Sequence, residues 1–421
     1  MPKEPQSTKP PKQRALLMLV HTDPTEDEYA EAELTSLAVA AGLEVLGALH
    51  QRVEKPSKHS YVGKGKLEEL FTAVHDAQAD LVVFDCELSG VQLRNLEETL
   101  KRRVIDRTQL ILDIFAQRAH TKEGKVQVEL AQLNYILPRI TAAYTQFERQ
   151  KGGIGLRGPG ETKLEADRRH IKRRLLSLKQ ELDEIEQARQ RQRAGRRRFP
   201  FPFACIVGYT SAGKSTLMNV LTGSDVFADP MLFATLDPTT RKVDLPDGYS
   251  VFLTDTVGFV RKLPTHLVAA FHATLEEVTG ADFLIHVVDA SHPNWELQHD
   301  AVIETLESLE AGDKPTITAF NKMDKPFDED AVRRLAEEMP HTVLISALKK
   351  QGLDQMYDKI IEVIRSLLVP VEMLIPYAES SLVQECYDYG RVLAVEHTDE
   401  GVHVRAELIR AMAERLAKFA K

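Results

Sequence analysis

The run from Gly208 to Thr216 reads Gly-Tyr-Thr-Ser-Ala-Gly-Lys-Ser-Thr, with four residues between its glycines and a Lys-Ser pair after the second. The glycines let the backbone curl around a polyphosphate so that its N–H groups point inward. The Lys214 ammonium can reach the β- and γ-phosphates, and the Ser215 hydroxyl can ligate Mg²⁺. We therefore expect a phosphate-binding loop whose contacts are Gly208, Tyr209, Thr210, Ser211, Ala212, Gly213, Lys214, Ser215 and Thr216.

The residues on either side of this loop predict the elements that must position it. The apolar run 203–207 predicts a short buried strand, and residues 215–221 predict the start of a helix. A strand, a glycine loop and a helix N-terminus together form a cradle for phosphate. This order distinguishes the run from an ordinary glycine-rich turn.

A carboxylate follows a second apolar run downstream. Residues 251–254 predict a strand that ends at Asp255, and Thr256, Val257 and Gly258 come directly after it. A carboxylate at a strand end can hold the Mg²⁺ shell, and the Gly258 N–H can bond to a γ-phosphate. We expect all four residues to contact the nucleotide, with Asp255 on the metal and with Lys214 and Gly258 among the catalytic groups.

A third strand, predicted over 316–320, ends in the run Asn321-Lys322-Met323-Asp324. The Asp324 carboxylate can accept hydrogen bonds from guanine N1–H and from its exocyclic amine, and adenine offers neither donor there. Such a site rejects the analogue that lacks the donors by ~10⁴ or more. The expected base contacts are Asn321, Lys322 and Asp324, with Ser346, Ala347 and Leu348 after a strand at 342–345.

The four motifs lie in order at strand ends, and this segment resembles the GTPases of the translation-factor class. In that resemblance, Thr235 corresponds to the threonine that closes over Mg²⁺ and the γ-phosphate. We therefore expect Phe233, Ala234 and Thr235 to contact the nucleotide. Thr235 joins Ser215 and Asp255 as a metal ligand, and Lys214 and Gly258 as a catalytic group. The alternative for this run is a plain surface loop.

Composition limits the remaining possibilities. The chain has 421 residues, three cysteines and a net charge of −9. Three scattered cysteines do not make a disulfide framework or a zinc site. No apolar run approaches the ~18 residues of a membrane span and no signal-peptide core stands at the N-terminus, so we expect a cytoplasmic protein. The negative net charge argues against nucleic-acid binding by the whole molecule but permits a local basic surface.

Strands alternate with helices early in the chain, and the pattern later becomes purely helical. Alternation predicts a small parallel α/β domain, and two helices with one apolar stripe each, at 126–139 and 164–192, predict an antiparallel hairpin. In the second helix the stripe is a heptad seam. The segments we expect are a disordered tail (1–13), an N-terminal α/β domain (14–120), a helical hairpin with linker (121–202), a GTPase domain (203–368) and a small α+β C-terminal domain (369–421).

The segment between the two hairpin helices is rich in glycine and in basic residues. Five glycines stand among the ten residues 151–160, so we expect a loop there. Residues 139–174 hold ten Arg and Lys against four Asp and Glu, a net of +6. The segment is either a solvated connector or a tip that contacts RNA phosphates. The expected rRNA contacts are Lys151, Arg157, Lys163, Arg168 and Arg169.

Four further motifs extend the resemblance to nearly the whole chain, which is similar to the HflX family of ribosome-associated GTPases in the Obg-HflX-like group. The motifs are residues 152–165, 61–66, 106–108 and 288–293. Membership implies Mg²⁺-dependent GTP hydrolysis to GDP, association with the large ribosomal subunit, and splitting or rescue of stalled ribosomes under stress. We expect the hairpin to make the contact with the subunit. Ribosome assembly, hibernation and a signalling role away from the ribosome are the alternatives, and we expect a monomer. The signalling class would need a lipid anchor, which the sequence does not carry.

Phe259 stands where Ras-like switches use a water-orienting Gln, a feature that the family shares, and Ser211 stands where the family has Asn, which puts potassium dependence in doubt. The run 63–66 fits a turn into a helix better than a second, ATP-linked site. His292 and His299, if they shared a helix face, would stand two turns apart, too far for one metal ion, so we expect structural roles.

Overall fold

The structure is a computed structural model, and it describes residues 12–21, 27–150, 159–196, 201–223, 232–233, 238–262 and 277–420. The chain divides into two compact units near residue 182. None of the helices in the described part of the chain is both long and apolar enough to span a membrane.

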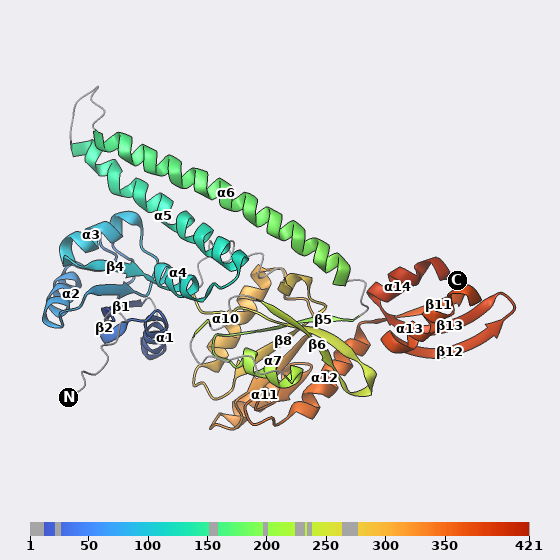
Figure 1. Cartoon of the computed structure of the whole chain (residues 1–421). Coiled ribbons are helices and arrows are strands. Elements are labelled where there is room, and N and C mark those ends of the chain that lie inside the picture. The colour runs from blue at the N-terminus through green and yellow to red at the C-terminus, as the bar shows by residue number, and fades with distance from the viewer. Residues whose placement is uncertain are drawn as a thin grey trace, which may run out of the picture. The chain divides into compact units, whose positions relative to one another are not determined.

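The first unit begins with strands and helices in alternation (Figure 1). Its elements are β1 (Arg14–His21), α1 (Asp27–Ala40), β2 (Glu44–Arg52), α2 (Lys64–Asp76), β3 (Leu81–Phe84), α3 (Gly90–Leu100), β4 (Arg103–Asp106) and α4 (Arg107–Arg118). The strand order is β2-β1-β3-β4 and every pair is parallel. The expected parallel α/β fold is confirmed. Helix α4 was not predicted, because it follows β4 without a loop, capped by the Asp106 carboxylate on the N–H of Gln109 at 2.8 Å.

Two long helices, α5 (Lys122–Gln150) and α6 (Pro159–Arg196), form the expected antiparallel hairpin (Figure 1). We predicted that the first would end at Arg139, but it continues through Pro138 to Gln150. A proline inside a helix removes one hydrogen bond at a cost of about 3 kcal/mol. The packing of α5 against α3, α4 and α6 offsets that cost. Gly160, which we placed in the loop, belongs to α6.

The heptad seam of α6 packs against α5. Leu175 and Leu178 are buried against Val126 and Leu130, and Ile171 and Leu182 are half-buried at the same contact. Beside the seam, Arg174 donates to both carboxylate oxygens of Glu129 at 2.7 Å. The apolar stripe predicted from the sequence is therefore the contact that holds the hairpin together.

The second unit contains a larger sheet with the strand order β10-β9-β8-β5-β7-β6. Its elements are β5 (Phe203–Gly208), α7 (Lys214–Thr222), β6 (Thr239–Asp244), β7 (Ser250–Asp255), β8 (Phe283–Asp289), α10 (Trp295–Ser308), β9 (Thr316–Asn321), α11 (Glu329–Glu338), β10 (Thr342–Leu344) and α12 (Leu353–Ser366). Only β6 runs antiparallel to its neighbour. Helices α7 and α12 pack in one core cluster, and α10 and α11 in another. The carboxyl ends of β5, β7 and β9 therefore meet at one edge, where ligands bind in such sheets.

The C-terminal elements form a small antiparallel sheet. They are β11 (Leu368–Ile375), α13 (Ser381–Tyr389), β12 (Gly390–Thr398), β13 (Gly401–Ile409) and α14 (Arg410–Leu416). The strand order is β11-β13-β12, with Thr398 opposite Gly401, so Asp399 and Glu400 form a hairpin turn. The expected α+β fold of this domain is confirmed, and helix α14 was not predicted.

Candidate nucleotide-binding site

The two glycines of the phosphate loop are required by its geometry. Gly208 has φ +148° and Gly213 has φ +102°, a region that side chains rarely adopt. A Cβ at Gly208 would collide with the carbonyl of Val287, and one at Gly213 would collide with the side-chain amide of Asn321. The turn from β5 into α7 therefore packs too closely against its neighbours for any side chain at these two positions.

The Lys214 ammonium is held within the loop. Its Nζ donates to the carbonyl of Tyr209 at 2.8 Å and to that of Gly208 at 3.1 Å, and the residue is 6% exposed. Burial lowers the pKa of Lys214 to about 8, and the nearby Asp255 carboxylate acts in the opposite direction. The loop thus contains a buried positive charge that a bound phosphate group would stabilise.

Two side chains whose oxygen atoms could ligate a metal ion lie together at the start of α7. The Ser215 hydroxyl donates to the Asp255 carboxylate at 2.7 Å, which joins the loop to the end of β7. The next residue, Thr256, is fully buried and donates to the carbonyl of Ile206 at 2.7 Å. A hydroxyl and a carboxylate side by side are the hard oxygen ligands that Mg²⁺ prefers, so this pair fits the ion.

The segment after Asp255 lies against the phosphate loop. The N–H of Thr210 donates to the carbonyl of Phe259 at 2.8 Å, and the N–H of Phe259 donates to that of Gly208 at 3.1 Å. A Cβ at Gly258 would lie 2.8 Å from the Thr210 methyl and 2.9 Å from the Lys214 Nζ. Gly258 therefore sits where any side chain would press on the loop and its lysine. Val257 beside it is buried.

The buried Asn321 side chain joins the phosphate loop to the base-binding segment. Its Nδ2 donates to the carbonyl of Ala212 at 2.8 Å, and its Oδ1 accepts from the N–H of Ala347 at 3.0 Å. Ser346, before Ala347, is fully buried, whereas Leu348, after it, is 71% exposed. One amide thus holds two loops that are far apart in sequence.

The remaining base-site residues lie around the same point. The Ser346 hydroxyl donates to the Asp324 carboxylate at 2.5 Å and lowers the pKa of this exposed group. The Lys322 Nζ donates to the carbonyl of Ser211 at 2.8 Å and to the Asp289 carboxylate at 2.6 Å. Asp324 is therefore held ionised and oriented as a hydrogen-bond acceptor, the form that guanine recognition needs.

Comparison with known proteins decides the family. Residues 28–116, 118–196 and 203–322 match three family models, described as GTP-binding GTPase N-terminal, GTP-binding GTPase Middle Region and 50S ribosome-binding GTPase. The chain is 46% identical to the GTPase HflX of Caldanaerobacter subterraneus over 97% of this chain and 94% of that protein. It is 43% identical to the GTPase HflX of Escherichia coli over 88% of each. The chain belongs to the HflX family of GTPases. It is a GTP hydrolase with a 50S ribosome-binding GTPase domain.

For several residues that we predicted to be functional in this HflX-family chain, the structure describes little or nothing. Phe233 is buried with φ +56°, whereas Ala234 and Thr235 lie outside the described residues. Lys151 and Arg157 also lie outside them, as do the tail up to residue 11 and the linker at 197–200. Arg168 and Arg169 are exposed on α6, and Lys163 belongs to the same helix.

Sequence reasoning missed Asp289 as part of this site. Asp289 ends β8 and pairs with Lys322, so it orients the base loop from a neighbouring strand. The motif at 288–293 contained it, but nothing in the motif indicates the partner. His292 precedes α10 and His299 lies on it, so the two do not share a helix face. Among the described residues, no group of three or more His, Cys, Asp or Glu side chains could hold a metal ion.

Proposed function

We propose that this chain is a Mg²⁺-dependent GTPase of the cytoplasm that works as a monomer on the large ribosomal subunit. In this proposal, residues 208–216 bind the phosphates of GTP and GDP, and Asn321, Lys322, Asp324 and residues 346–348 bind guanine. Ser215, Thr235 and Asp255 hold the ion, which neutralises charge on the phosphates when it is bound. The supporting observation is the Ser215–Asp255 hydrogen bond of 2.7 Å at the edge of the sheet.

Hydrolysis needs a water molecule aligned with the γ-phosphate. Phe259 offers no side-chain group for this, and its backbone is bonded to Gly208 and Thr210. The chain itself supplies the Lys214 charge, the Gly258 N–H and the closing Thr235, and a partner that orders the switches supplies the alignment. A ~100-fold stimulation by the partner corresponds to about 2.7 kcal/mol of barrier, which positioning alone can provide.

The hairpin is the element that we propose to dock on rRNA. Its first helix is anchored to the N-terminal domain by Arg139, whose guanidinium donates to the Asp106 carboxylate at 3.1 Å and to the carbonyl of Leu88 at 2.8 Å. Exposed Arg168 and Arg169 lie on the other helix, α6, which also includes Lys163, and Arg157 precedes that helix in the sequence. A rigid base and basic side chains near the far end suit an element that enters a phosphate-lined space.

The cellular role that we propose is the splitting or rescue of stalled ribosomes under stress. It is supported by the likeness to GTPases HflX over nearly the whole chain, hairpin included. Ribosome assembly is the second candidate, because a GTPase that binds separated large subunits could also act while they mature. A signalling role away from the ribosome has no observation in its favour.

The test is sedimentation of the purified protein with separated subunits and with intact ribosomes, with a non-hydrolysable GTP analogue or GDP. The proposal expects cosedimentation with the large subunit in the GTP-like state and release of small subunits from intact ribosomes. Binding to large subunits without any splitting would favour the assembly role. Absence of binding to either subunit would contradict the proposal.

A further inference from the structure

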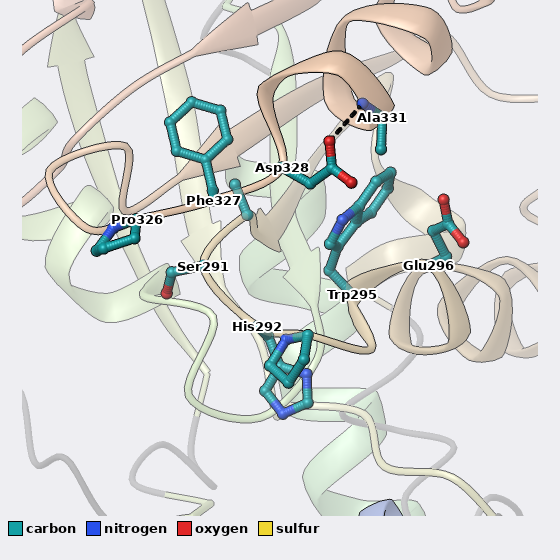
Figure 2. A pocket seen from close by; sticks show the side chains of 10 residues that line it. Ser291, His292, Trp295, Glu296, Pro326, Phe327, Asp328 and Ala331 are labelled. Atoms are coloured by element: carbon teal, nitrogen blue, oxygen red, sulfur yellow. Dashed lines mark hydrogen bonds between the residues drawn. The ribbon is translucent and has the colours of Figure 1, made fainter.

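A pocket of about 410 Å³ lies beside the base-binding loop, between the β8–α10 and β9–α11 loops (Figure 2). Its apolar lining includes Pro293, Trp295 and Phe327. Trp295 is buried and packs edge-to-face on Phe320, with ring centroids 5.3 Å apart, so this part of the lining is closely packed. The proposed GTPase chemistry uses none of these side chains.

The charged side chains that line the pocket are carboxylates. Glu296 and Asp328 are both exposed, and the described lining includes no Lys or Arg. The N-terminal ends of α10 and α11 contribute about +0.5 charge each. Glu329 and Asp330, in the first turn of α11, add two more negative charges. Lys325, Arg333 and Arg334 offset the charges of Glu329 and Asp330, and Arg333 pairs with Glu329 directly. No Lys or Arg opposes Glu296 and Asp328 within the described lining, so a cation is favoured over a phosphate.

Aromatic rings and prolines beside two carboxylates are the surroundings that suit a guanidinium. Its plane stacks on apolar and aromatic faces, and its fork of N–H groups can bond to carboxylates. A lysine ammonium is a more strongly hydrated point charge and gains less from such a lining. A single arginine side chain therefore fits the chemistry of the pocket.

The pocket is connected to the nucleotide site by hydrogen bonds. The Ser291 hydroxyl, in the lining, donates to the Asp289 carboxylate at 2.7 Å. The other oxygen of Asp289 accepts from Lys322 at 2.6 Å, and Lys322 also bonds to the carbonyl of Ser211 in the phosphate loop. A ligand that moves the Ser291 loop thus acts on both the base loop and the phosphate loop.

We infer that this pocket receives an arginine side chain from a basic protein segment of the large ribosomal subunit. The inference rests on the proposed association with that subunit and adds a second contact, made with protein, to the contact between the hairpin and rRNA. The positive charge on the hairpin suits the phosphates of rRNA, and the negative charge at the pocket suits a basic protein segment.

The test places a photo-crosslinking benzoylphenylalanine at Phe327 in the full chain, with purified large subunits and a non-hydrolysable GTP analogue. We expect a covalent product that is destroyed by protease and not by ribonuclease, and whose crosslinked peptide contains an arginine. A product with rRNA, or no product while the same protein cosediments with the subunit, overturns the inference and leaves the proposed function standing.

A charge-neutral variant supplies an independent measurement. Glu296→Gln with Asp328→Asn removes both charges, and Asn at 328 can still cap α11, as Asp328 now does on the N–H of Ala331 at 2.9 Å. We expect about tenfold weaker binding to large subunits, with basal GTP hydrolysis unchanged.

The matched control is Glu304→Gln with Glu337→Gln, two exposed carboxylates on the same helices outside the pocket. Equal binding by the parent and the two double variants overturns the inference. If the parent itself fails to bind large subunits, the proposed function falls, and the inference falls with it.

Discussion

Asn321 and Ala212 stand 109 positions apart, yet the side-chain amide of one donates to the carbonyl of the other at 2.8 Å. The same side chain accepts from the N–H of Ala347. The loop that we propose to bind phosphate and the loops that we propose to surround the base are therefore one hydrogen-bonded unit. A change at any of the three reaches the others through a single buried amide.

Replacing Asn321 by Ala is expected to weaken both the fold and nucleotide binding. The carbonyl of Ala212 and the N–H of Ala347 lose their partner, which costs about 1–3 kcal/mol of unfolding free energy. We expect GDP affinity to fall at least ~10-fold. Urea unfolding and titration with a fluorescent GDP analogue measure the two effects. Asn134→Ala, at an exposed position on α5, is the control and should change neither.

Asp324→Asn is expected to relax the preference for guanine. The carboxylate accepts at both oxygens, whereas an amide presents a donor on one side, so one of the two guanine donors meets an N–H. The parent should bind inosine diphosphate, which lacks the exocyclic amine, about 10-fold or more weakly than GDP. The variant should narrow this difference and the one between GTP and ATP. Equal affinity of the parent for GTP and ATP would rule out the role assigned to Asp324.

Gly258→Ala is expected to slow hydrolysis more than it weakens GDP binding. The added methyl would approach the Thr210 methyl and the Lys214 ammonium to less than 3 Å, so the segment after Asp255 must move away from the phosphate loop. The rate of single-turnover GTP hydrolysis should fall at least ~10-fold, which corresponds to an activation barrier about 1.4 kcal/mol higher. Gly280→Ala, where an added methyl meets no neighbouring atom within 4 Å, is the control. A normal hydrolysis rate in Gly258→Ala would show that catalysis does not depend on the close approach of this segment to the phosphate loop.

The buried Lys214 predicts how stability without added nucleotide depends on pH. Burial lowers its folded-state pKa from an ordinary 10.5 to about 8. Between these values the unfolded chain binds more protons, so the free energy of unfolding should rise with pH there and level off below pH 8. The Lys214 contribution from pH 7 to 9.5 is about 2 kcal/mol.

Urea unfolding at several pH values, compared with Lys214→Met, isolates this contribution from those of other groups. The parent should gain stability relative to the variant as pH rises from 8. Parallel curves for the two proteins would mean that the ammonium is not desolvated in the loop.

Reversing charge on the hairpin is expected to separate docking from chemistry. Arg157→Glu with Lys163→Glu should abolish stimulation of GTP hydrolysis by large subunits and leave basal hydrolysis unchanged. Steady-state hydrolysis with and without subunits, for parent and double variant, measures both. Full stimulation of the variant would exclude the hairpin as the docking element. Loss of basal hydrolysis as well would indicate a damaged fold, and Arg168→Glu with Arg169→Glu, at exposed positions on α6, then repeats the test.

The nucleotide motifs could be found from the sequence because each is short and its chemistry depends on consecutive residues. A glycine at 208, a glycine at 213 and Lys-Ser after it are needed wherever a loop wraps phosphate. The heptad seam of α6 was visible for the same reason, because its period is local. Elements with weaker local signals were missed. Strand β6 reads Thr-Thr-Arg-Lys-Val-Asp, and it is a strand only because β7 pairs with it.

By itself, the sequence determined the class of ligand and the type of each domain, and it predicted the residues on which the chemistry depends. The tertiary structure decided which of those residues touch. Asn321 reaches Ala212, Asp289 reaches Lys322 and Phe259 bonds to Gly208 because the strand order places β5 between β7 and β8, with β9 beside β8. Spacing along a chain cannot encode such pairs, since they depend on how strands are ordered across a sheet. For the same reason, the pocket beside Trp295 exists only in the folded protein.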